Sequence, residues 1–370
     1  MHLDDLLRKA VESSASDLHI TVESPPMTRI NGHLKPVAGA TGPSGSERLT
    51  PSDTHDLLYG VLKDDQKARF EAHGELDFSY SIHGLSRFRV NAFKQRGTVG
   101  IVCRVIPMTI RTIQELGLPE VVTQLARCTR GLILVTGPTG SGKSTTLAAM
   151  IDLINSERSD HILTLEDPIE YLHKHKKSIV NQREMGVDSA SYATALRAAL
   201  REDPDVILVG EMRDLETTQI ALTAAETGHL VLSTLHTQDA AQTIDRAIDI
   251  FPPYQQEQVK TQLAGTLQGI VAQLLLTRID VPGRVAAFEI LVATSAVKNL
   301  IREGKTHQIP SAIQTGAKYG MKSMEASLRD LYQRGMISQE DFLVRVPGAA
   351  AQLGAGGGLG GAGGGLGGRF

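Results

Sequence analysis

Apolar residues recur at helical spacing where the chain begins. Leu3, Leu6, Leu7 and Val11 lie three or four positions apart, which predicts an amphipathic helix over residues 3–13. Residues 18–22 are mostly apolar or β-branched and predict a short strand. The chain is therefore expected to open with a helix followed by a strand.

Three longer strand-like stretches follow, at residues 76–82, 87–93 and 99–106. Short turns separate them, and short turns join antiparallel neighbours, so this part predicts an antiparallel meander. Residues 43–51 are rich in Gly, Ser and Pro and are expected to form a loop. Together these elements indicate an α+β domain over residues 1–107, followed by a linker over 108–117.

The pattern changes near Leu132 to short aliphatic stretches that alternate with longer helical ones, which is typical of a mostly parallel sheet. The expected strands are 132–136, 162–165, 206–209 and 230–235, with crossover helices at 191–200 and 217–227. From Gln255 to about Val346 the chain is expected to be helical. We therefore predict an α/β domain over 118–346 with a helical C-terminal part, and a disordered Gly-rich tail over 347–370.

Composition narrows the class of protein. With 41% hydrophobic and 21% charged residues the chain is an ordinary globular protein. No apolar run approaches the roughly 18 residues that a membrane span needs, and the first ten residues lack a signal-like apolar core, so a cytoplasmic protein is expected. Cys103 and Cys128 form no CxxC pair, which argues against a zinc site. A net charge of −3 argues against nucleic acid as the main partner.

The clearest chemical signal is GPTGSGKS at residues 137–144, which fits G-x(4)-G-K-[ST] between an aliphatic strand and a helix expected to open at Thr145. In such a P-loop backbone N–H groups surround phosphate oxygens, Lys143 reaches the β- and γ-phosphates, and the Ser144 hydroxyl binds Mg²⁺. ATP and Mg are thus the expected cofactors. The residues expected to bind nucleotide are Gly137, Pro138, Thr139, Gly140, Ser141, Gly142, Lys143, Ser144 and Thr145.

Two acids follow predicted strands at the end where ligands gather in such sheets. Glu211 comes after strand 206–209, and it is a candidate both for holding Mg²⁺ and for activating water. Glu166 ends the strand 162–165 and is the second candidate for orienting the attacking water. The nearby Asp167 can instead serve a turn, and Glu170 can be a surface charge.

His229 and His236 lie at the two ends of strand 230–235. Their odd separation sends them to opposite faces of a continuous strand. A lone His is usually structural, but either ring can instead sense the γ-phosphate, because a neutral imidazole donates one hydrogen bond and accepts another.

Arginines line one face of the predicted meander. Arg87, Arg89 and Asn91 share a strand face, and Arg104 lies on the next strand. A half-exposed sheet with ordinary solvated arginines would show the same pattern. An arginine supplied by a neighbouring subunit is worth about 10³ to 10⁵ in rate, and a head-to-tail ring can bring one subunit's arginines to the next subunit's site.

Over about residues 1–345 the sequence resembles the secretion ATPase superfamily, and specifically the type IV pilus retraction ATPase (PilT) family. The P-loop, residues 165–171, residues 209–214 and the paired-His segment look like the family's Walker A, Asp, Walker B and His boxes. Residues 296–305 look like its C-terminal retraction signature, with Val297 and Lys298 in place of the usual Ile and Arg. The Gly-rich tail lies outside the family pattern.

The resemblance implies a homohexamer with a PAS-like N-terminal domain and a RecA-like ATPase domain. It implies that ATP hydrolysis drives pilus retraction and twitching motility at the cytoplasmic face of the inner membrane, with a membrane platform protein as partner. It also suggests Arg87, Arg89 and Arg104 as the arginines that meet nucleotide across the subunit boundary.

Two alternatives remain open on the sequence. Pilus-extension and type II secretion ATPases share the P-loop, but they usually carry a longer N-terminal region and a tetracysteine zinc motif, and neither is present in this chain. A non-hydrolysing accessory paralogue would bind nucleotide only to assemble with an active partner. The intact Lys143, Glu166 and Glu211 argue against that second alternative.

Overall fold

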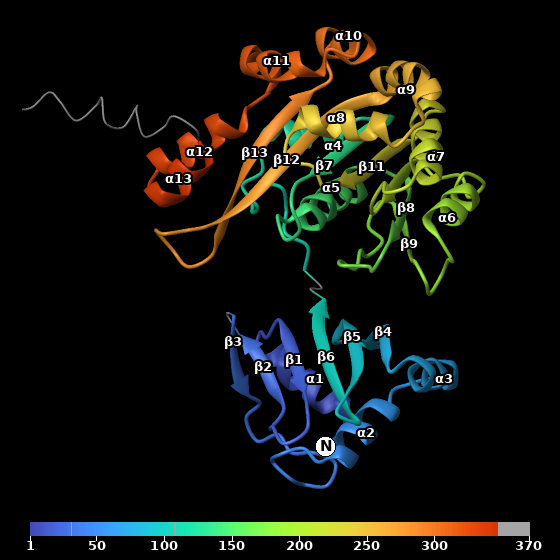
Figure 1. The fold of residues 1–370 in the computed structure, drawn as a ribbon, viewed down its shortest axis with the longest axis vertical. Coiled ribbons are helices and arrows are strands. Elements are labelled where there is room, and N and C mark those ends of the chain that lie inside the picture. The colour runs from blue at the N-terminus through green and yellow to red at the C-terminus, as the bar shows by residue number, and fades with distance from the viewer. Residues whose placement is uncertain (31, 107–108, 347–370) are drawn as a thin grey trace, which may run out of the picture. The chain divides into compact units, whose positions relative to one another are not determined.

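The computed structural model describes residues 1–30, 32–106 and 109–346, which form two compact units (Figure 1). The first unit comprises Met1–Ile110 and Pro168–His173, and the second comprises Arg111–Asp167 and the chain from Lys174. The predicted disordered tail, 347–370, lies outside the described residues.

The first unit is built on a six-stranded sheet in the order β3-β2-β1-β6-β5-β4, with every neighbouring pair antiparallel. The predicted opening helix and strand are confirmed, and so is the meander of β4, β5 and β6. Two short strands and two helices were not predicted. The elements are α1 (Leu3–Glu12), β1 (Asp17–Ile20), β2 (Met27–Ile30), β3 (His33–Pro36), α2 (Pro51–Tyr59), α3 (Asp64–His73), β4 (Glu75–Ile82), β5 (Ser86–Gln95) and β6 (Thr98–Ile106).

Alternation along β5 divides this sheet into an apolar and a polar face. Phe88, Val90 and Ala92 are fully buried and share a core with residues of all three helices. Arg87 is half-buried and Arg89 is exposed, because successive side chains of a strand point to opposite faces. The arginines therefore lie on the face opposite the one that the helices cover.

The second unit contains a seven-stranded sheet in the order β13-β12-β7-β11-β10-β8-β9. All neighbours pair in parallel except β12 and β13. The four predicted strands are confirmed as β7 (Gly131–Thr136), β8 (His161–Glu166), β10 (Val206–Val209) and β11 (Leu230–Leu235), and the two predicted crossover helices as α6 (Tyr192–Ala199) and α7 (Leu215–Glu226). Strand β9 (Ile179–Glu184) was not predicted.

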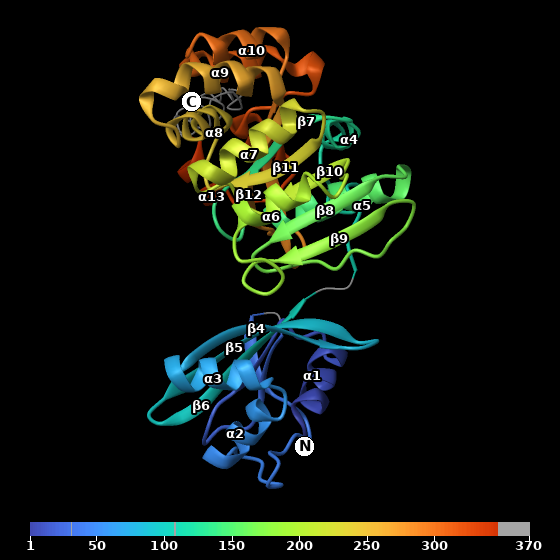
Figure 2. The same cartoon turned by 90° about the vertical axis from the view of Figure 1, so that its right-hand side faces the viewer.

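Helices cover both faces of this sheet (Figure 2). In β7, Leu132 and Leu134 point into the core with α6, α7, α8 (Ala240–Asp249) and α9 (Pro253–Thr266). Ile133 and Val135 point into the core with α4 (Glu120–Ala126) and α5 (Lys143–Glu157). Because both faces are buried, the strands are almost continuously aliphatic.

The expectation of a helical chain from Gln255 to Val346 is wrong for its central part. After α9 the chain forms β12 (Leu267–Thr277) and β13 (Arg284–Val292), an antiparallel pair that adds to the parallel sheet beside β7. A continuous apolar run suits a buried strand as well as a buried helix, so its periodicity could not decide between them. The remainder is helical as expected: α10 (Ser295–Arg302), α11 (Ile309–Thr315), α12 (Met324–Gln333) and α13 (Gln339–Arg345), with short 3₁₀ turns at Thr306–Gln308 and Ala317–Tyr319.

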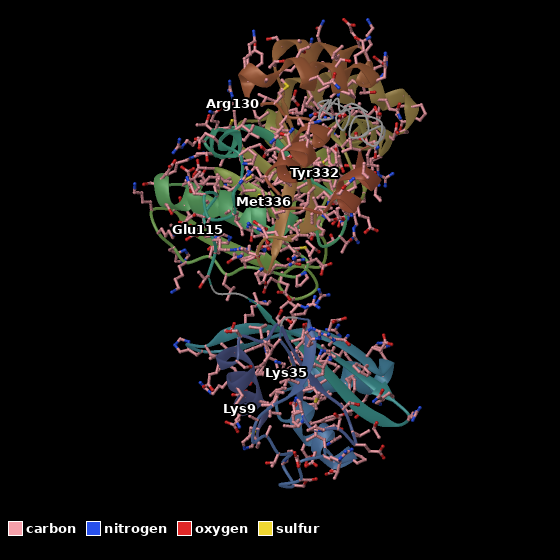
Figure 3. All side chains as sticks on the ribbon, turned by 90° about the vertical axis from the view of Figure 1, so that its left-hand side faces the viewer. Lys9, Lys35, Glu115, Arg130, Tyr332 and Met336 are labelled. Atoms are coloured by element: carbon pink, nitrogen blue, oxygen red, sulfur yellow. The ribbon has the colours of Figure 1, made fainter. Side chains whose placement is uncertain are left out.

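The last two helices pack on the β12–β13 pair through a small separate core. Tyr332 stacks on Phe342 with ring centroids 4.8 Å apart, and Met336 and Leu276 belong to the same cluster. Figure 3 labels Tyr332 and Met336. None of the helices in the described part of the chain has both the length and the apolar character of a membrane span.

Helix α10, which carries the segment that resembles a retraction signature, is anchored by two side chains. Val297 and Ile301 are fully buried in the same core as α9, and Thr294 caps the helix by accepting a hydrogen bond from the Val297 N–H. Lys298 is half-buried and Arg302 is exposed. The helix thus presents its basic residues away from the core.

We expect Ile301→Ala to lower the free energy of unfolding of the second unit by about 2 to 5 kcal/mol, because it leaves a cavity under α10. Arg302→Ala, next to it on the exposed face, is the matched control and should change that free energy by less than about 0.5 kcal/mol. Urea denaturation followed by circular dichroism measures both. Equal losses from the two variants would show that Ile301 does not anchor the helix.

Candidate nucleotide-binding and catalytic site

The register of the parallel strands places their carboxyl ends at one edge of the sheet. Val209 of β10 pairs with Leu165 of β8 and Ser233 of β11, and Thr136 of β7 pairs with Leu235 of β11. Such an edge is where ligands bind in open α/β sheets. Four predicted site elements follow these ends: the P-loop after β7, Glu166 at the end of β8, Glu211 after β10 and His236 after β11.

The P-loop adopts a conformation that requires glycine. Gly137, Gly140 and Gly142 have φ angles of 139°, 79° and 91°, which L side chains rarely adopt. A Cβ on Gly137 would also lie 2.7 Å from the Ser141 Oγ. Helix α5 begins directly after the loop at Lys143, so the N–H groups of its first turn are available to bind an anion.

Two polar side chains of the loop are buried within it. Lys143 is 9% exposed, and its Nζ donates hydrogen bonds to the backbone oxygens of Gly137 at 2.9 Å and Pro138 at 3.1 Å. Ser141 is 3% exposed, and its Oγ has no hydrogen-bond partner among the described residues. A buried ammonium, an unbonded hydroxyl and a cradle without room for a Cβ fit a phosphate group. Ser144, half-buried on the first turn of α5, offers a hydroxyl suited to Mg²⁺.

Glu211 is held between two basic side chains. Its Oε2 lies 2.7 Å from the Arg213 Nε, and its Oε1 lies 3.4 Å from the His236 Nε2. The Glu211 side chain is 18% exposed, whereas that of Arg213 is 76% exposed. The structure therefore brings together two predicted residues, Glu211 and His236, and adds Arg213 to them.

The structure does not bring His229 to this edge. His229 precedes β11 at the strand's amino end, and its ring Nδ1 lies 2.9 Å from the backbone oxygen of Ala224 at the end of α7. The six residues of β11 separate it from His236 by about 20 Å. The His229 ring thus meets a helix end, and of the two histidines only His236 is placed near Glu211.

The second predicted acid, Glu166, accepts hydrogen bonds from two neutral side chains. Its Oε1 accepts hydrogen bonds from the Thr164 Oγ1 at 2.6 Å and the Gln182 Nε2 at 3.2 Å. Gln182 comes from β9, the strand that the sequence did not reveal. Asp167 and Glu170 are exposed, which suits the alternative interpretation of Glu170 as a surface charge.

Tyr192 of α6 lies among the acids. Its pKa is raised first by burial and then by three neighbouring carboxylates, those of Asp167, Glu166 and Glu211. A Cβ on Gly210 would lie only 2.7 Å from the Tyr192 Oη and 3.1 Å from the Leu165 backbone oxygen. The residue before Glu211 must therefore be small, since Tyr192 and β8 occupy the space beside it.

The predicted arginines lie together on the sheet of the first unit. Arg89 of β5 pairs directly with Arg104 of β6, and Arg87 lies two residues before Arg89. The Arg104 Nε donates a hydrogen bond to the Asp17 Oδ1 at 2.9 Å. Burial alone would raise the pKa of Asp17, but hydrogen bonds from Arg104 and Ser16 hold it below its usual value. The Asp17 carboxylate therefore compensates part of the positive charge that Arg89 and Arg104 place opposite each other on this face.

Three site residues were missed by the sequence analysis: Arg213, Tyr192 and Gln273. Arg213 stands two residues after Glu211 and could have been considered from that proximity alone. Gln273, whose Nε2 donates a hydrogen bond to the backbone oxygen of Ser141 in the P-loop, interrupts an aliphatic run, and an amide in such a run is a signal for a buried polar contact. Nothing in the local sequence marks Tyr192. In the described part of the chain, no cluster of three or more His, Cys, Asp or Glu residues is arranged to hold a metal ion by itself.

Comparison with known proteins matches these features to one family. The model of the family described as Type II/IV secretion system protein matches residues 1–342. The chain is 49% identical over 341 residues to the type IV pilus retraction ATPase PilT of Pseudomonas aeruginosa, covering 92% of this chain and 97% of that protein. It is 48% identical over 315 residues to a twitching motility protein of Neisseria gonorrhoeae, covering 85% of this chain and 82% of that protein.

A solved structure agrees with these relatives. The fold matches the crystal structure of the pilus retraction motor PilT with bound ADP at a TM-score of 0.86 and 50% identity, covering 94% of this chain and 97% of that chain.

We expect Gly210→Ala to destabilise the second unit by about 1 to 3 kcal/mol, since the added methyl group overpacks the space beside Tyr192. Adding Tyr192→Phe should restore part of that loss, because it removes the nearest atom. Gly265→Ala on α9 is the matched control: its Cβ would meet nothing within 4 Å, and it should be neutral or slightly stabilising. Thermal unfolding measures all three, and a harmless Gly210→Ala would contradict the close packing.

Proposed function

The chain belongs to the Type II/IV secretion system protein family, and from that premise we propose that it is an ATP-hydrolysing motor that drives the retraction of type IV pili. The observation that carries the hydrolysis is the meeting of the P-loop, Glu166 and Glu211 at one edge of the sheet. The assignment to pilus retraction rests on the similarity to the two named relatives and to the solved structure of a retraction motor.

Each residue of the site has its own role in the transfer of the γ-phosphoryl group to water. The P-loop N–H groups and Lys143 hold the phosphates, and Ser144 would hold Mg²⁺, which neutralises phosphate charge when bound. Glu211 orients the attacking water and accepts its proton, with Glu166 as the supporting carboxylate. His236, beside Glu211, is placed to donate or accept a hydrogen bond at the γ-phosphate.

We infer that the working form is a homohexamer in which the first unit is a PAS-like domain and the second a RecA-like domain. Arg87, Arg89 and Arg104 then serve the nucleotide of a neighbouring subunit, where a cation stabilises the charge of the transferred phosphoryl group. The exposed Arg89 supports this, because it lies directly opposite Arg104, whose guanidinium is already bonded to the Asp17 carboxylate, and so leaves a cation on this face for an anion.

The motor acts in the cytoplasm at the inner membrane, with a pilus platform protein as its partner and no role for nucleic acid. Helix α10 is the proposed output surface. Its resemblance to the retraction signature and its exposed Arg302 support that assignment.

We expect Glu211→Ala to bind ATP but to hydrolyse it about 10² to 10⁴ times more slowly, because it loses the group that positions water. Pili of cells that carry this variant as their only copy should not retract. The matched control is Glu257→Ala, whose carboxylate is 81% exposed on α9 and pairs only locally with Lys260. A phosphate-release assay and microscopy of labelled pili give the two measurements. Near-normal ATP turnover by Glu211→Ala would remove Glu211 from the mechanism. Pili that still retract in cells whose only copy is an inactive Glu211→Ala variant would remove the retraction assignment.

Subunit mixing tests the arginines. Arg104→Ala and Lys143→Ala should each abolish most ATP turnover, and a mixed ring should recover part of it, because some interfaces then join an intact P-loop to an intact arginine. Mixing Lys143→Ala with Glu211→Ala is the control without recovery, since both changes disable the same site.

Arg89→Ala provides a second arginine variant, because Arg104 is also bonded to Asp17 and its loss can destabilise the first unit. Native mass spectrometry verifies the mixed rings. If verified rings of either arginine variant with Lys143→Ala show no more activity than the control, catalysis does not use these arginines across subunits.

A further inference from the structure

A buried amide on a strand outside every nucleotide motif contacts the P-loop. Gln273 lies on β12, which pairs in parallel with β7, and its side chain is 2% exposed between aliphatic neighbours. A buried amide has a cost unless its donors and acceptor are hydrogen-bonded. Both ends of this amide are bonded, and both partners belong to the loop or to the helix that follows it.

The two hydrogen bonds run in opposite senses. The Gln273 Nε2 donates to the backbone oxygen of Ser141 at 2.6 Å, and the Gln273 Oε1 accepts from the Thr146 Oγ1 at 2.9 Å. Ser141 lies within the loop, and Thr146 lies on the first turn of α5. One side chain thus joins the loop to the helix that carries Lys143. Only a group with a donor and an acceptor at this reach satisfies both partners.

The same residue also limits the glycines at both ends of the loop. A Cβ on Gly137 would lie 2.3 Å from the Gln273 backbone oxygen, and a Cβ on Gly142 would lie 3.2 Å from its Nε2. Gln273 therefore touches the entry, the interior and the exit of the phosphate-binding loop. A polar residue that served only the core would have no reason to find every partner in this one segment.

We propose that Gln273 is a positioning residue that holds the P-loop in its phosphate-binding conformation, so that nucleotide affinity depends on a side chain from outside the motif. The inference rests on the proposed function, because it takes this loop to be the ATP site. Phosphate contacts of the loop are made in the ground state and in the transition state alike. Loss of the two Gln273 hydrogen bonds, which together we call the clamp, should therefore raise the KM for ATP and leave kcat nearly unchanged.

The test compares Gln273→Met with Gln268→Met. Met keeps the length of the side chain and removes both hydrogen bonds. Gln268 is the matched control because it lies on the same strand and donates to the backbone oxygen of Arg130, away from the loop. Titration with fluorescently labelled ADP should show at least about a tenfold loss of affinity for Gln273→Met, the loss expected for a buried hydrogen-bonding group left without its partner. Gln268→Met should bind like the wild type.

A second pair covers the case in which Gln273→Met does not fold. Thr146→Val removes one of the two bonds, and Thr146→Ser keeps the hydroxyl. The first should weaken ADP binding and raise the KM for ATP, and the second should restore both. A residue that is only structural would instead lower the active fraction, and with it kcat, at an unchanged KM.

The outcomes separate this inference from the proposed function. Wild-type ADP affinity in folded Gln273→Met, or an equal loss in Gln268→Met, would overturn the clamp. Failure of Thr146→Ser to restore what Thr146→Val loses would overturn it as well. Wild-type protein that binds ADP but shows no ATP turnover would refute the proposal that the chain is an ATP-hydrolysing motor. The same ADP titrations would still decide the role of Gln273.

Discussion

The backbone between β7 and α5 passes so close to β12 that the P-loop cannot begin with any residue other than glycine. A Cβ on Gly137 would lie 2.3 Å from the backbone oxygen of Gln273, a distance that real Cβ atoms do not reach. This approach is fixed by the parallel pairing of β7 with β12, which continues to Thr136, the last residue of β7. The loop must therefore turn tightly and enter α5 at once, and Lys143 is carried into it. The same parallel register brings Glu166 and Glu211 to this edge. One sheet therefore determines the positions of both the P-loop and the two acids.

The parts that local sequence predicted are those whose signal is local. Strands β7, β8, β10 and β11 are aliphatic runs that end in turn residues, and the P-loop is a contiguous motif. Strand β12 was assigned to a helix because a long apolar run has no period that distinguishes the two. Strand β9 mixes Asn, Gln, Arg and Glu with two apolar residues, because it lies at the edge of the sheet. Whether a strand lies at the edge of a sheet depends on the whole fold, and the local sequence does not determine it.

The site residues that were missed depend on contacts between distant parts of the chain. Gln273 meets Ser141 across 132 positions, and Tyr192 meets Gly210 only because α6 packs beside the ends of β8 and β10. The two histidines show the same dependence. Their odd spacing predicted opposite faces of a continuous strand, and sequence order puts His229 at the amino end of β11 and His236 at its carboxyl end. The parallel pairing of β11 with β7 brings that carboxyl end to the P-loop edge, and the sequence could not supply this pairing.

The surroundings of Glu211 and Glu166 differ, and this bears on the division of roles that the sequence left open. Glu166 accepts hydrogen bonds from Thr164 and Gln182, two neutral donors on neighbouring strands, so its carboxylate is held in one orientation. Glu211 lies between the His236 ring and Arg213, whose side chain is 76% exposed, and water screens the pair with Arg213. The Glu211 carboxylate can therefore exchange Arg213 for a water molecule at a lower cost than Glu166, which would have to give up the hydrogen bonds from Thr164 and Gln182. This difference supports the proposal that Glu211 accepts the proton of the water, with Glu166 as the supporting carboxylate.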